Sequence, residues 1–247
     1  MQQQQKIIKV KGDSLIIDAD SSGSSSDKPL ALVVFLENVG HIVGLDLPYR
    51  VTRVIDWIAE EYGKVMLRFY GAYQRYDKVI ILEDADATGI NLSNALLDTS
   101  KEYTVDVLLL VHGHEEYLVG HMGTELVGAE TFGPLAKAYK QDSSVLDLRM
   151  VYGLNCHGAS LAEWWLALGA KAVNGAAGIN WMPEPSLSVF LENWLRGVPY
   201  GKSVRRSNNA ANSIWGQILR PKAGQVEHPA ITSSYMHIYG NSEIKIT

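Results

Sequence analysis

The sequence predicts an α/β fold in which a mostly parallel sheet is covered by helices on both faces. Three observations carry this prediction: short apolar runs, segments with helical periodicity, and alternation of the two along the chain. Strands of a parallel sheet read as continuous apolar runs because both of their faces are buried. The runs are LALVVFLE (30–37), DKVIILED (77–84), TVDVLLLV (104–111), LRMVYGLN (148–155) and AKAVNGAAG (170–178).

The residues before the first of these strands have a different character. Residues 6–19 alternate apolar and polar side chains around a Gly-Asp pair, which predicts a short hairpin. The stretch DSSGSSSDKP (20–29) is typical of a flexible linker. We therefore expect an N-terminal extension over residues 1–28 and one domain over residues 29–247.

Amphipathic helices are expected between and after the strands. In the first of them, Val51, Val54, Ile55, Ile58 and Tyr62 recur at a spacing that places them on one helical face. The predicted helices cover residues 49–63, 87–100, 130–141, 159–169, 185–196 and 201–219.

Composition excludes several classes of protein. The net charge of −5 and the absence of a long basic run argue against a nucleic-acid partner. No signal sequence is apparent and no apolar run approaches membrane-spanning length, so we expect a soluble, cytoplasmic protein without a membrane partner. The single cysteine, Cys156, rules out an intramolecular disulfide and a cysteine-rich zinc site. The sequence gives no sign of a cofactor and leaves the oligomeric state open.

Two reactive side chains follow the ends of predicted strands. His112 comes directly after one apolar run and Cys156 directly after another. The carboxyl ends of parallel strands meet at one edge of a sheet, where ligands bind. A thiolate is a strong nucleophile, and a neighbouring imidazole can act as its base. Gly113 permits a close backbone approach to a substrate, as an oxyanion-binding N–H requires.

Four stretches of the chain resemble the caspase-like superfamily of cysteine peptidases, which includes caspases, metacaspases, clostripain and the CHAT domains. They are DVLLLVHGHEEYLVGHMGTELVGAETFGPLAKAY, YGLNCHGAS, LALGAKAVNGAAG and FLENWLRGVPYGKSVRRSNNAA. The resemblance covers residues 30 to 215. It implies a three-layer α/β/α fold, and it implies a cysteine endopeptidase that cleaves protein or peptide substrates through a thioester acyl-enzyme.

The resemblance also assigns roles to individual residues. His112 matches the catalytic histidine and Cys156 matches the nucleophile. The backbone N–H groups of Gly113 and Cys156 match the donors to the oxyanion. His114 is a rival for the role of base, because Gly113-His114 is similar to the Gly-His pair of metacaspases, and His114 is otherwise a candidate contact for the substrate.

One departure from the metacaspase pattern concerns substrate specificity. Leu154 stands where metacaspases carry an acidic residue two positions before the cysteine. A pocket for Arg or Lys must then take its carboxylate from another position. Asp84, Asp86 and Glu184 are the candidates, in that order, although the two aspartates are equally suited to cap the helix that begins near Ala87.

Two alternatives compete with a peptidase. The first is a non-catalytic caspase-like or CHAT-like module that binds partners or serves as a scaffold. The second is a metal-dependent hydrolase built on His112 and His114, with His121 or His157 and a carboxylate such as Asp84 as further ligands. Histidines two residues apart on an extended segment share a face, so this geometry is permitted.

Overall fold

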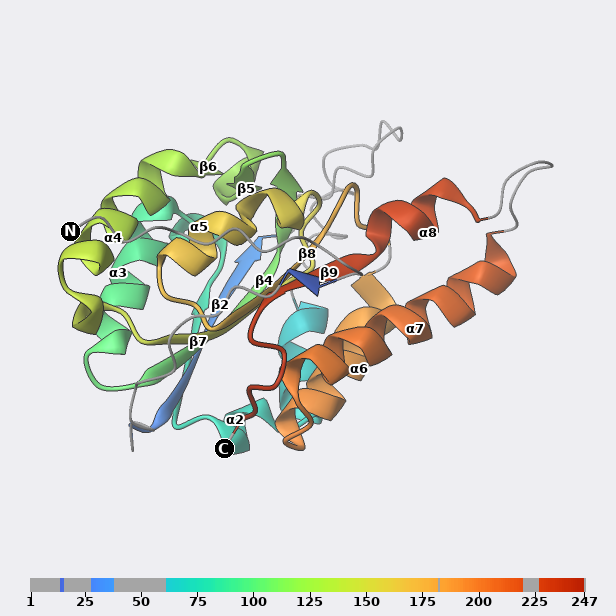
Figure 1. Cartoon of the computed structure of the whole chain (residues 1–247), viewed down its shortest axis with the longest axis horizontal. Coiled ribbons are helices and arrows are strands. Elements are labelled where there is room, and N and C mark those ends of the chain that lie inside the picture. Colours follow the sequence, from blue (N-terminus) through green and yellow to red (C-terminus); the bar gives the residue numbers. More distant parts are fainter. Residues whose placement is uncertain (1–13, 16–27, 38–60, 182, 220–226, 247) are drawn as a thin grey trace.

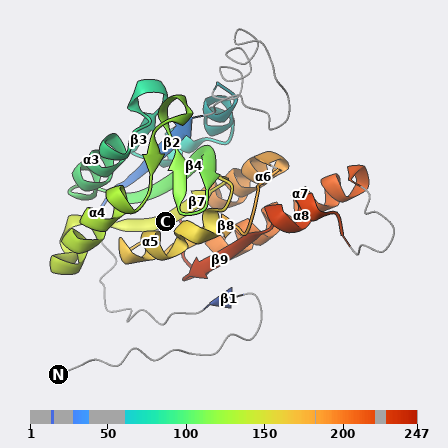
Figure 2. The same ribbon diagram turned by 90° about the horizontal axis from the view of Figure 1, so that it is seen from above.

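The computed structural model describes residues 14–15, 28–37, 61–181, 183–219 and 227–246. Its sheet has the strand order β1-β9-β8-β7-β4-β2-β3, and Figure 2 shows β3, β2, β4, β7, β8 and β9 side by side in this order. The central strands are β2 (Leu30–Glu37), β3 (Lys78–Leu82), β4 (Thr104–His114), β7 (Leu148–Gly153) and β8 (Ala172–Ala176). Each of them lies on an apolar run that the sequence predicts as a strand.

The central strands all run in the same direction. β2 pairs in parallel with β3 and β4, β4 pairs in parallel with β7, and β7 pairs in parallel with β8. All six residues of β7 are buried, as a strand covered on both faces requires. The predicted mostly parallel sheet is therefore confirmed.

Helices cover both faces of the sheet, and Figure 1 shows α3, α4 and α5 on one side and α6 and α7 on the other. Residues 61–69 are also helical. The predicted helix 159–169 divides into a 3-10 turn and a short α-helix, because Gly158–Leu161 adopts the tighter geometry. The α-helices are α2 (Ala72–Arg75), α3 (Gly89–Ser100), α4 (Ala129–Gln141), α5 (Ala162–Ala167), α6 (Pro183–Leu195), α7 (Tyr200–Ile218) and α8 (Pro229–Ser234).

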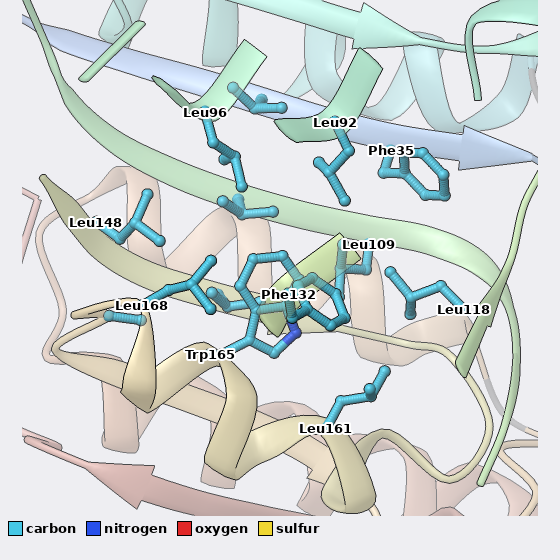
Figure 3. Close-up of a cluster of buried hydrophobic side chains, with 14 of the residues drawn as sticks. Phe35, Leu92, Leu96, Leu109, Leu118, Phe132, Leu148, Leu161, Trp165 and Leu168 are labelled. Carbon is cyan, nitrogen blue, oxygen red and sulfur yellow. The ribbon is translucent and has the colours of Figure 1, made fainter. Parts of the chain in front are cut away.

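The core on the first face of the sheet is built by α3, α4 and α5. Leu92 and Leu96 of α3 reach it from one side, and Phe132 and Trp165 reach it from α4 and α5 (Figure 3). The rings of Phe132 and Trp165 have their centroids 5.0 Å apart. Val107 faces this core from the middle of β4. β4 is therefore anchored in the core before it reaches His112.

The core on the second face is aromatic. Tyr152 of β7 stacks on Phe190 of α6 with ring centroids 3.5 Å apart, and Phe190 also contacts Trp194. Leu108 of β4 joins the same cluster. Alternate residues of β4 thus enter opposite cores, as the twofold side-chain period of a strand requires.

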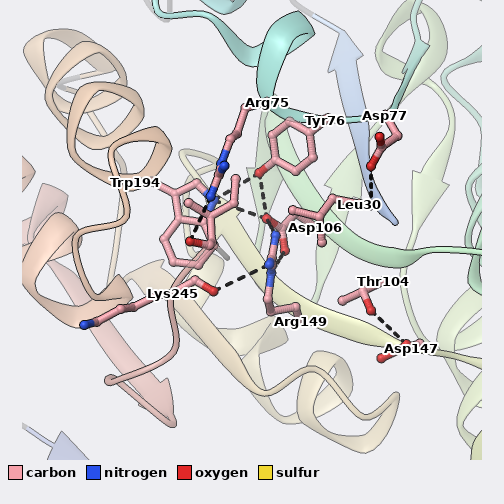
Figure 4. A network of polar contacts seen from close by, with 11 residues as sticks. Leu30, Arg75, Tyr76, Asp77, Thr104, Asp106, Asp147, Arg149, Trp194 and Lys245 are labelled. Carbon is pink, nitrogen blue, oxygen red and sulfur yellow. Dashed lines mark hydrogen bonds and ion pairs between the residues drawn. The ribbon is translucent and has the colours of Figure 1, made fainter. Parts of the chain in front are cut away.

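A buried polar network lies at the amino ends of β4 and β7 (Figure 4). The guanidinium of Arg149 donates to both carboxylate oxygens of Asp106, at 2.8 and 2.7 Å. The hydroxyl of Tyr76 and the indole N–H of Trp194 also donate to Asp106, at 2.6 and 3.2 Å. Every charge here has a partner, so this edge of the sheet is held by hydrogen bonds as well as by apolar contacts.

The last elements of the chain extend the sheet in a way that the sequence analysis does not anticipate. β9 (Met236–Gly240) follows α8 and pairs antiparallel with β8. β1 (Ser14–Leu15) pairs in parallel with β9. The remainder of the predicted hairpin 6–19, most of the linker 20–29 and most of the helix 49–63 lie outside the described residues.

None of the described helices combines the length and the apolar character that a membrane crossing needs.

Candidate active site

The candidate site lies where two neighbouring strands end. β4 and β7 are adjacent and parallel, and their last paired residues are Leu109 and Gly153. β4 continues past this point through His112 and His114, while the chain leaves β7 and reaches Cys156 three residues later. The predicted meeting of the two strand ends at one edge of the sheet is confirmed.

The end of β4 forms a ribbon with the next strand, which we call the histidine ribbon (residues 112–119). β5 (Tyr117–Val119) pairs antiparallel with β4, so that His112 lies opposite Val119 and His114 lies opposite Tyr117. His112 is half-buried and His114 is exposed. The difference in burial places His112 closer to the protein interior and leaves His114 in contact with solvent. β6 (Leu126–Val127) extends this ribbon as the third strand.

The histidine ribbon touches the segment that carries the thiol, which we call the cysteine loop (residues 154–160). A Cβ atom added to Gly113 would lie 2.3 Å from the carbonyl oxygen of Cys156, closer than real side chains approach. The same atom would lie 3.0 Å from the Cβ of Asn155. Backbone therefore packs on backbone, and glycine is required at position 113 for this approach. His112 is one residue away from the contact.

Backbone N–H groups surround the thiol of Cys156. The N–H of Asn180 donates to Sγ at 3.4 Å. Burial raises the pKa of the Cys156 thiol above its ordinary value, and hydrogen bonds from the N–H groups of Asn180, Cys156 and Gly113 offset part of that rise. The sulfur is thus mostly protonated at neutral pH, and it needs a base before it can act as a nucleophile.

The cysteine loop is fixed to β8 and to the residues that follow it. Gly158 packs directly on Gly175 of β8, where a Cβ atom would lie 2.2 Å from the carbonyl carbon of Gly158. The N–H of His157 donates to the carbonyl of Gly178 at 2.7 Å, and the side chain of Asn180 donates to the carbonyl of Leu154 at 3.0 Å. These contacts give the thiol a rigid support.

Asn155, the residue before Cys156, is buried within the cysteine loop. It is 2% exposed, and its side-chain N–H donates to the carbonyl of Cys156 at 3.3 Å. A Cβ atom on Gly153 or Gly158 would lie 2.6 or 3.2 Å from atoms of this side chain. The glycines around the cysteine loop therefore leave room for one buried amide.

His157 and His114 meet at the outer surface of the site. Their ring centroids are 6.0 Å apart, and Nδ1 of His157 lies 4.0 Å from a carboxylate oxygen of Glu115. His157 adopts a left-handed backbone conformation with φ of 53°. The exposed rim of the site is thus formed by two imidazoles and a carboxylate.

Asp84 and Asp86 lie in a 3-10 turn after β3, and both are exposed. β3 is three strand positions away from β7, which corresponds to about 14 Å at the usual strand spacing. The capping alternative for these aspartates is wrong: the N-cap of α3 is Thr88, whose hydroxyl accepts the N–H of Asn91 at 3.2 Å. Thr88 takes the N-cap position because the 3-10 turn at residues 84–86 precedes α3, which therefore begins only at Gly89.

Glu184 lies within the bounds of α6, next to its first residue, but its backbone there is extended, with φ of −120° and ψ of 141°. One of its carboxylate oxygens is buried and has no hydrogen-bond partner among the described residues. Burial raises the pKa of the nearby Tyr62 hydroxyl, and the negative charge of Glu184 adds to the rise. The backbone carbonyl of Glu184 accepts the indole N–H of Trp215 at 2.7 Å, which fixes the start of α6 against α7.

The sequence analysis missed three residues that the structure brings to this edge. Glu37 ends β2 opposite Val111 of β4, is 7% exposed, and accepts the N–H of Met122 at 3.0 Å. A carboxylate that ends an apolar strand is a signal of such a site, since buried acids are rare without a partner. Asn155 and Asn180 carry no comparable signal, because their roles depend on the path of the loops.

Within the ranges that the structure describes, no group of three His, Cys, Asp or Glu side chains is arranged to hold a metal ion. The described residues thus supply no ligand set for the metal-dependent alternative on His112 and His114.

Comparison with known proteins supports the fold. No known family matches the sequence, and no curated protein matches it. The chain is similar to the crystal structure of the Arg-specific cysteine proteinase gingipain R, with a TM-score of 0.56 and 15% identity over 88% of this chain and 47% of that chain. A complex of the pro- and mature domains of RgpB from Porphyromonas gingivalis gives a TM-score of 0.55 and 15% identity over 87% of this chain and 48% of that chain.

A further solved structure, described as a protease, gives a TM-score of 0.54 and 14% identity over 87% of this chain and 48% of that chain. The chain spans about half the length of these solved structures. At such low identity the structural similarity shows the fold alone, and the three-layer α/β/α arrangement that the sequence resemblance implies is confirmed. The chain has the caspase-like fold of the gingipain cysteine proteinases.

Proposed function

We propose that the chain is a cysteine endopeptidase in which Cys156 is the nucleophile and His112 is the general acid and base. One observation carries the proposal. Gly113, the residue after His112, packs on the backbone of Cys156, and its N–H lowers the pKa of the thiol against the effect of burial. An imidazole, a thiol and backbone donors therefore come from two strand ends that meet, which is the set of groups that acyl transfer requires.

The proposed reaction has two halves. His112 takes the proton from the thiol of Cys156 while the sulfur attacks the carbonyl carbon of the scissile bond. The tetrahedral intermediate then collapses to a thioester, and His112 gives the proton to the leaving amine. In the second half His112 takes a proton from a water molecule as the water oxygen attacks the thioester carbon. The C–S bond then breaks, the carboxylic acid leaves, and His112 returns the proton to the thiolate of Cys156.

The N–H groups of Gly113 and Cys156 are the proposed donors to the oxyanion. Both already act on the sulfur, where they lower the pKa of the thiol against the effect of burial. A carbonyl carbon bonded to Sγ would carry its oxygen close to the sulfur, within the range of the same donors. This convergence supports the assignment of both groups.

We also propose that any pocket for a basic side chain uses Glu184 ahead of Asp84 and Asp86. The backbone N–H of Asn180 donates to the thiol. Glu184 comes only four residues after Asn180 in the sequence. The aspartates belong to a strand three positions from β7. Glu184→Gln should lower kcat/KM for an arginyl substrate at least tenfold relative to an alanyl one, and Asp84→Ala with Asp86→Ala should leave the ratio unchanged.

The assignment of the dyad is tested by three variants and one optimised fluorogenic peptide. Loss of a general acid and base costs about 10² to 10⁴ in rate, so His112→Ala should abolish measurable turnover as Cys156→Ala does. His114→Ala should keep a readily measured fraction of the activity, because His114 is exposed at the rim. Circular dichroism establishes that each variant is folded. The reverse ranking of the histidines would move the catalytic role to His114.

The raised pKa of the Cys156 thiol favours one other candidate, a caspase-like module that binds partners without catalysis. A buried thiol of raised pKa is inert unless a base is aligned with it. A peptidyl acyloxymethyl ketone separates the two candidates because it alkylates an activated cysteine. Labelling of the wild-type protein at Cys156, together with loss of labelling in His112→Ala, supports the peptidase. Absence of labelling in the wild-type protein would favour the binding module.

A further inference from the structure

The hydroxyl of Ser160 links the two halves of the candidate site. It accepts the backbone N–H of Glu116, in the turn of the histidine ribbon, at 2.7 Å. It donates to the backbone carbonyl of His157, in the cysteine loop, at 2.7 Å. Glu116 and Ser160 are 44 residues apart in the sequence, so one side chain joins two segments that are distant along the chain.

Both backbone groups that Ser160 binds belong to residues in a strained conformation. Glu116 has φ of 66° and His157 has φ of 53°, in the left-handed region that favours glycine. The turn of the ribbon has only two residues, Glu115 and Glu116, and glycine is the usual residue where φ is positive in such turns. Non-glycine residues persist there when the surroundings hold them in place, and the hydroxyl of Ser160 contributes one hydrogen bond to each of them, beside the bond from the N–H of His157 to Gly178.

The other contacts between the ribbon and the loop act at different places along the ribbon. Gly113 touches Cys156 through backbone atoms at the root of the ribbon, next to His112. The rings of His114 and His157 are 6.0 Å apart and tilted by 34°, which is a loose contact. The hydrogen bond between Glu116 and Ser160 lies at the tip of the ribbon, far from the contact of Gly113. It therefore restrains the orientation of the ribbon and, with it, the orientation of His112.

We propose that Ser160 is a positioning residue, which holds the histidine ribbon against the cysteine loop and so aligns His112 with Cys156 for proton transfer. This inference rests on the proposed peptidase function. Ser160 itself is exposed and takes no part in bond making. Its effect is therefore expected in kcat, which depends on the alignment of the reacting groups, and not in the binding of the substrate.

The test compares Ser160→Ala with Ser160→Thr and with a matched control. Loss of the hydroxyl should lower kcat about tenfold, the effect of one or two hydrogen bonds, and should change KM less than about twofold. Ser160→Thr keeps the hydroxyl and should recover at least half of the kcat. The control is Ser144→Ala, because Ser144 is an exposed serine beyond the opposite end of β7 whose hydroxyl binds the carboxylate of Asp142, and it should leave kcat unchanged.

Hydrogen exchange of the Glu116 amide shows whether the hydrogen bond itself is lost in Ser160→Ala and restored in Ser160→Thr. Exchange of the Glu116 amide hydrogen should be faster in Ser160→Ala than in the wild-type protein, since its acceptor is lost. If that exchange accelerates while kcat stays the same, Ser160 is not a positioning residue. The same conclusion follows if Ser160→Thr fails to restore kcat although the Glu116 amide is protected again.

Failure of the proposed function gives a different pattern. If the wild-type protein cleaves no peptide, the alignment is measured by the alkylation of Cys156 with iodoacetamide as a function of pH, which needs no turnover. Ser160→Ala should then slow the alkylation at neutral pH at least threefold, because a misaligned His112 is a poorer base for the thiol. An unchanged pH profile in that variant would overturn the inference.

Discussion

Replacement of Gly113 by alanine tests whether the histidine ribbon and the cysteine loop must touch. The new Cβ atom would lie 2.3 Å from the carbonyl oxygen of Cys156, and real Cβ atoms do not approach heavy atoms closer than 3.0 Å. The two backbones must therefore separate by at least the difference, 0.7 Å. The carbonyl belongs to the main chain and cannot rotate aside, and Asn155 at 3.0 Å blocks a sideways escape.

A displacement of this size has a predictable cost. A misplacement of about 1 Å lowers the rate of an enzymatic reaction about 10²-fold, so Gly113→Ala should lower kcat/KM by roughly 30- to 100-fold. Insertion of a methyl group into a packed site destabilises a protein by about 1 to 3 kcal/mol, which leaves the variant folded if its stability is typical. The loss of activity should therefore exceed what the folded fraction explains.

The assay measures kcat/KM with the optimised fluorogenic peptide and the free energy of unfolding with urea. Gly216→Ala is the matched control, because Gly216 lies in α7 and its nearest contact to an added Cβ atom is an ordinary 3.9 Å. Alanine in place of glycine inside a helix stabilises by about 0.5 to 1 kcal/mol, so the control should gain stability and keep its activity. Full activity in Gly113→Ala would refute the argument that this contact sets the geometry of the site.

Three other predictions concern stability and pH. Arg149→Met leaves the carboxylate of Asp106 buried without its cation, and urea unfolding should show a loss of about 3 to 5 kcal/mol. Thr88→Ala removes the cap of α3 and should cost about 1 kcal/mol by the same measurement, whereas Asp86→Ala should cost less than half of that. Burial raises the pKa of the Cys156 thiol, so in a protein that lacks its base through His112→Ala, alkylation by iodoacetamide should be slow at neutral pH and should still increase above the ordinary thiol pKa. A rate that levels off below that pH would contradict the raised pKa.

The parts of the fold that the sequence predicts are those that local patterns encode. The apolar run 104–111 predicts a buried strand, and the structure extends it to His114 because the strand continues into a ribbon after it leaves the sheet. The meeting of His112 and Cys156 at one edge follows from parallel strands alone, since no side-chain detail is needed to place strand ends together. Topology thus makes this part of the site predictable.

Other features depend on contacts that no local pattern records. β1 is two residues long and is defined by its pairing with β9, more than two hundred residues later. Asp86 has the side chain of a good cap, but Thr88 caps the helix because an additional 3-10 turn comes first. Asn180 acts on the thiol only because its loop folds back over the sheet. Each of these outcomes is decided by tertiary packing.

The two edges of the sheet divide the tasks of stability and reactivity. Asp106 and His112 belong to the same strand, and six residues of extended chain separate them by about 20 Å. Arg149 stabilises the edge at the amino ends of β4 and β7 through a buried ion pair, whereas Gly113 shapes the edge at their carboxyl ends through a backbone contact.

Effects of substitutions at this distance on the free energy of unfolding are additive unless a shared element carries strain between them. The double variant Arg149→Met with Gly113→Ala should therefore show the sum of the two losses in unfolding free energy, and the catalytic defect of its folded fraction should equal that of Gly113→Ala alone. A coupling free energy larger than about 1 kcal/mol between the two substitutions would mean that β4 transmits a displacement along its length. The conclusion that the two edges act independently would then be wrong.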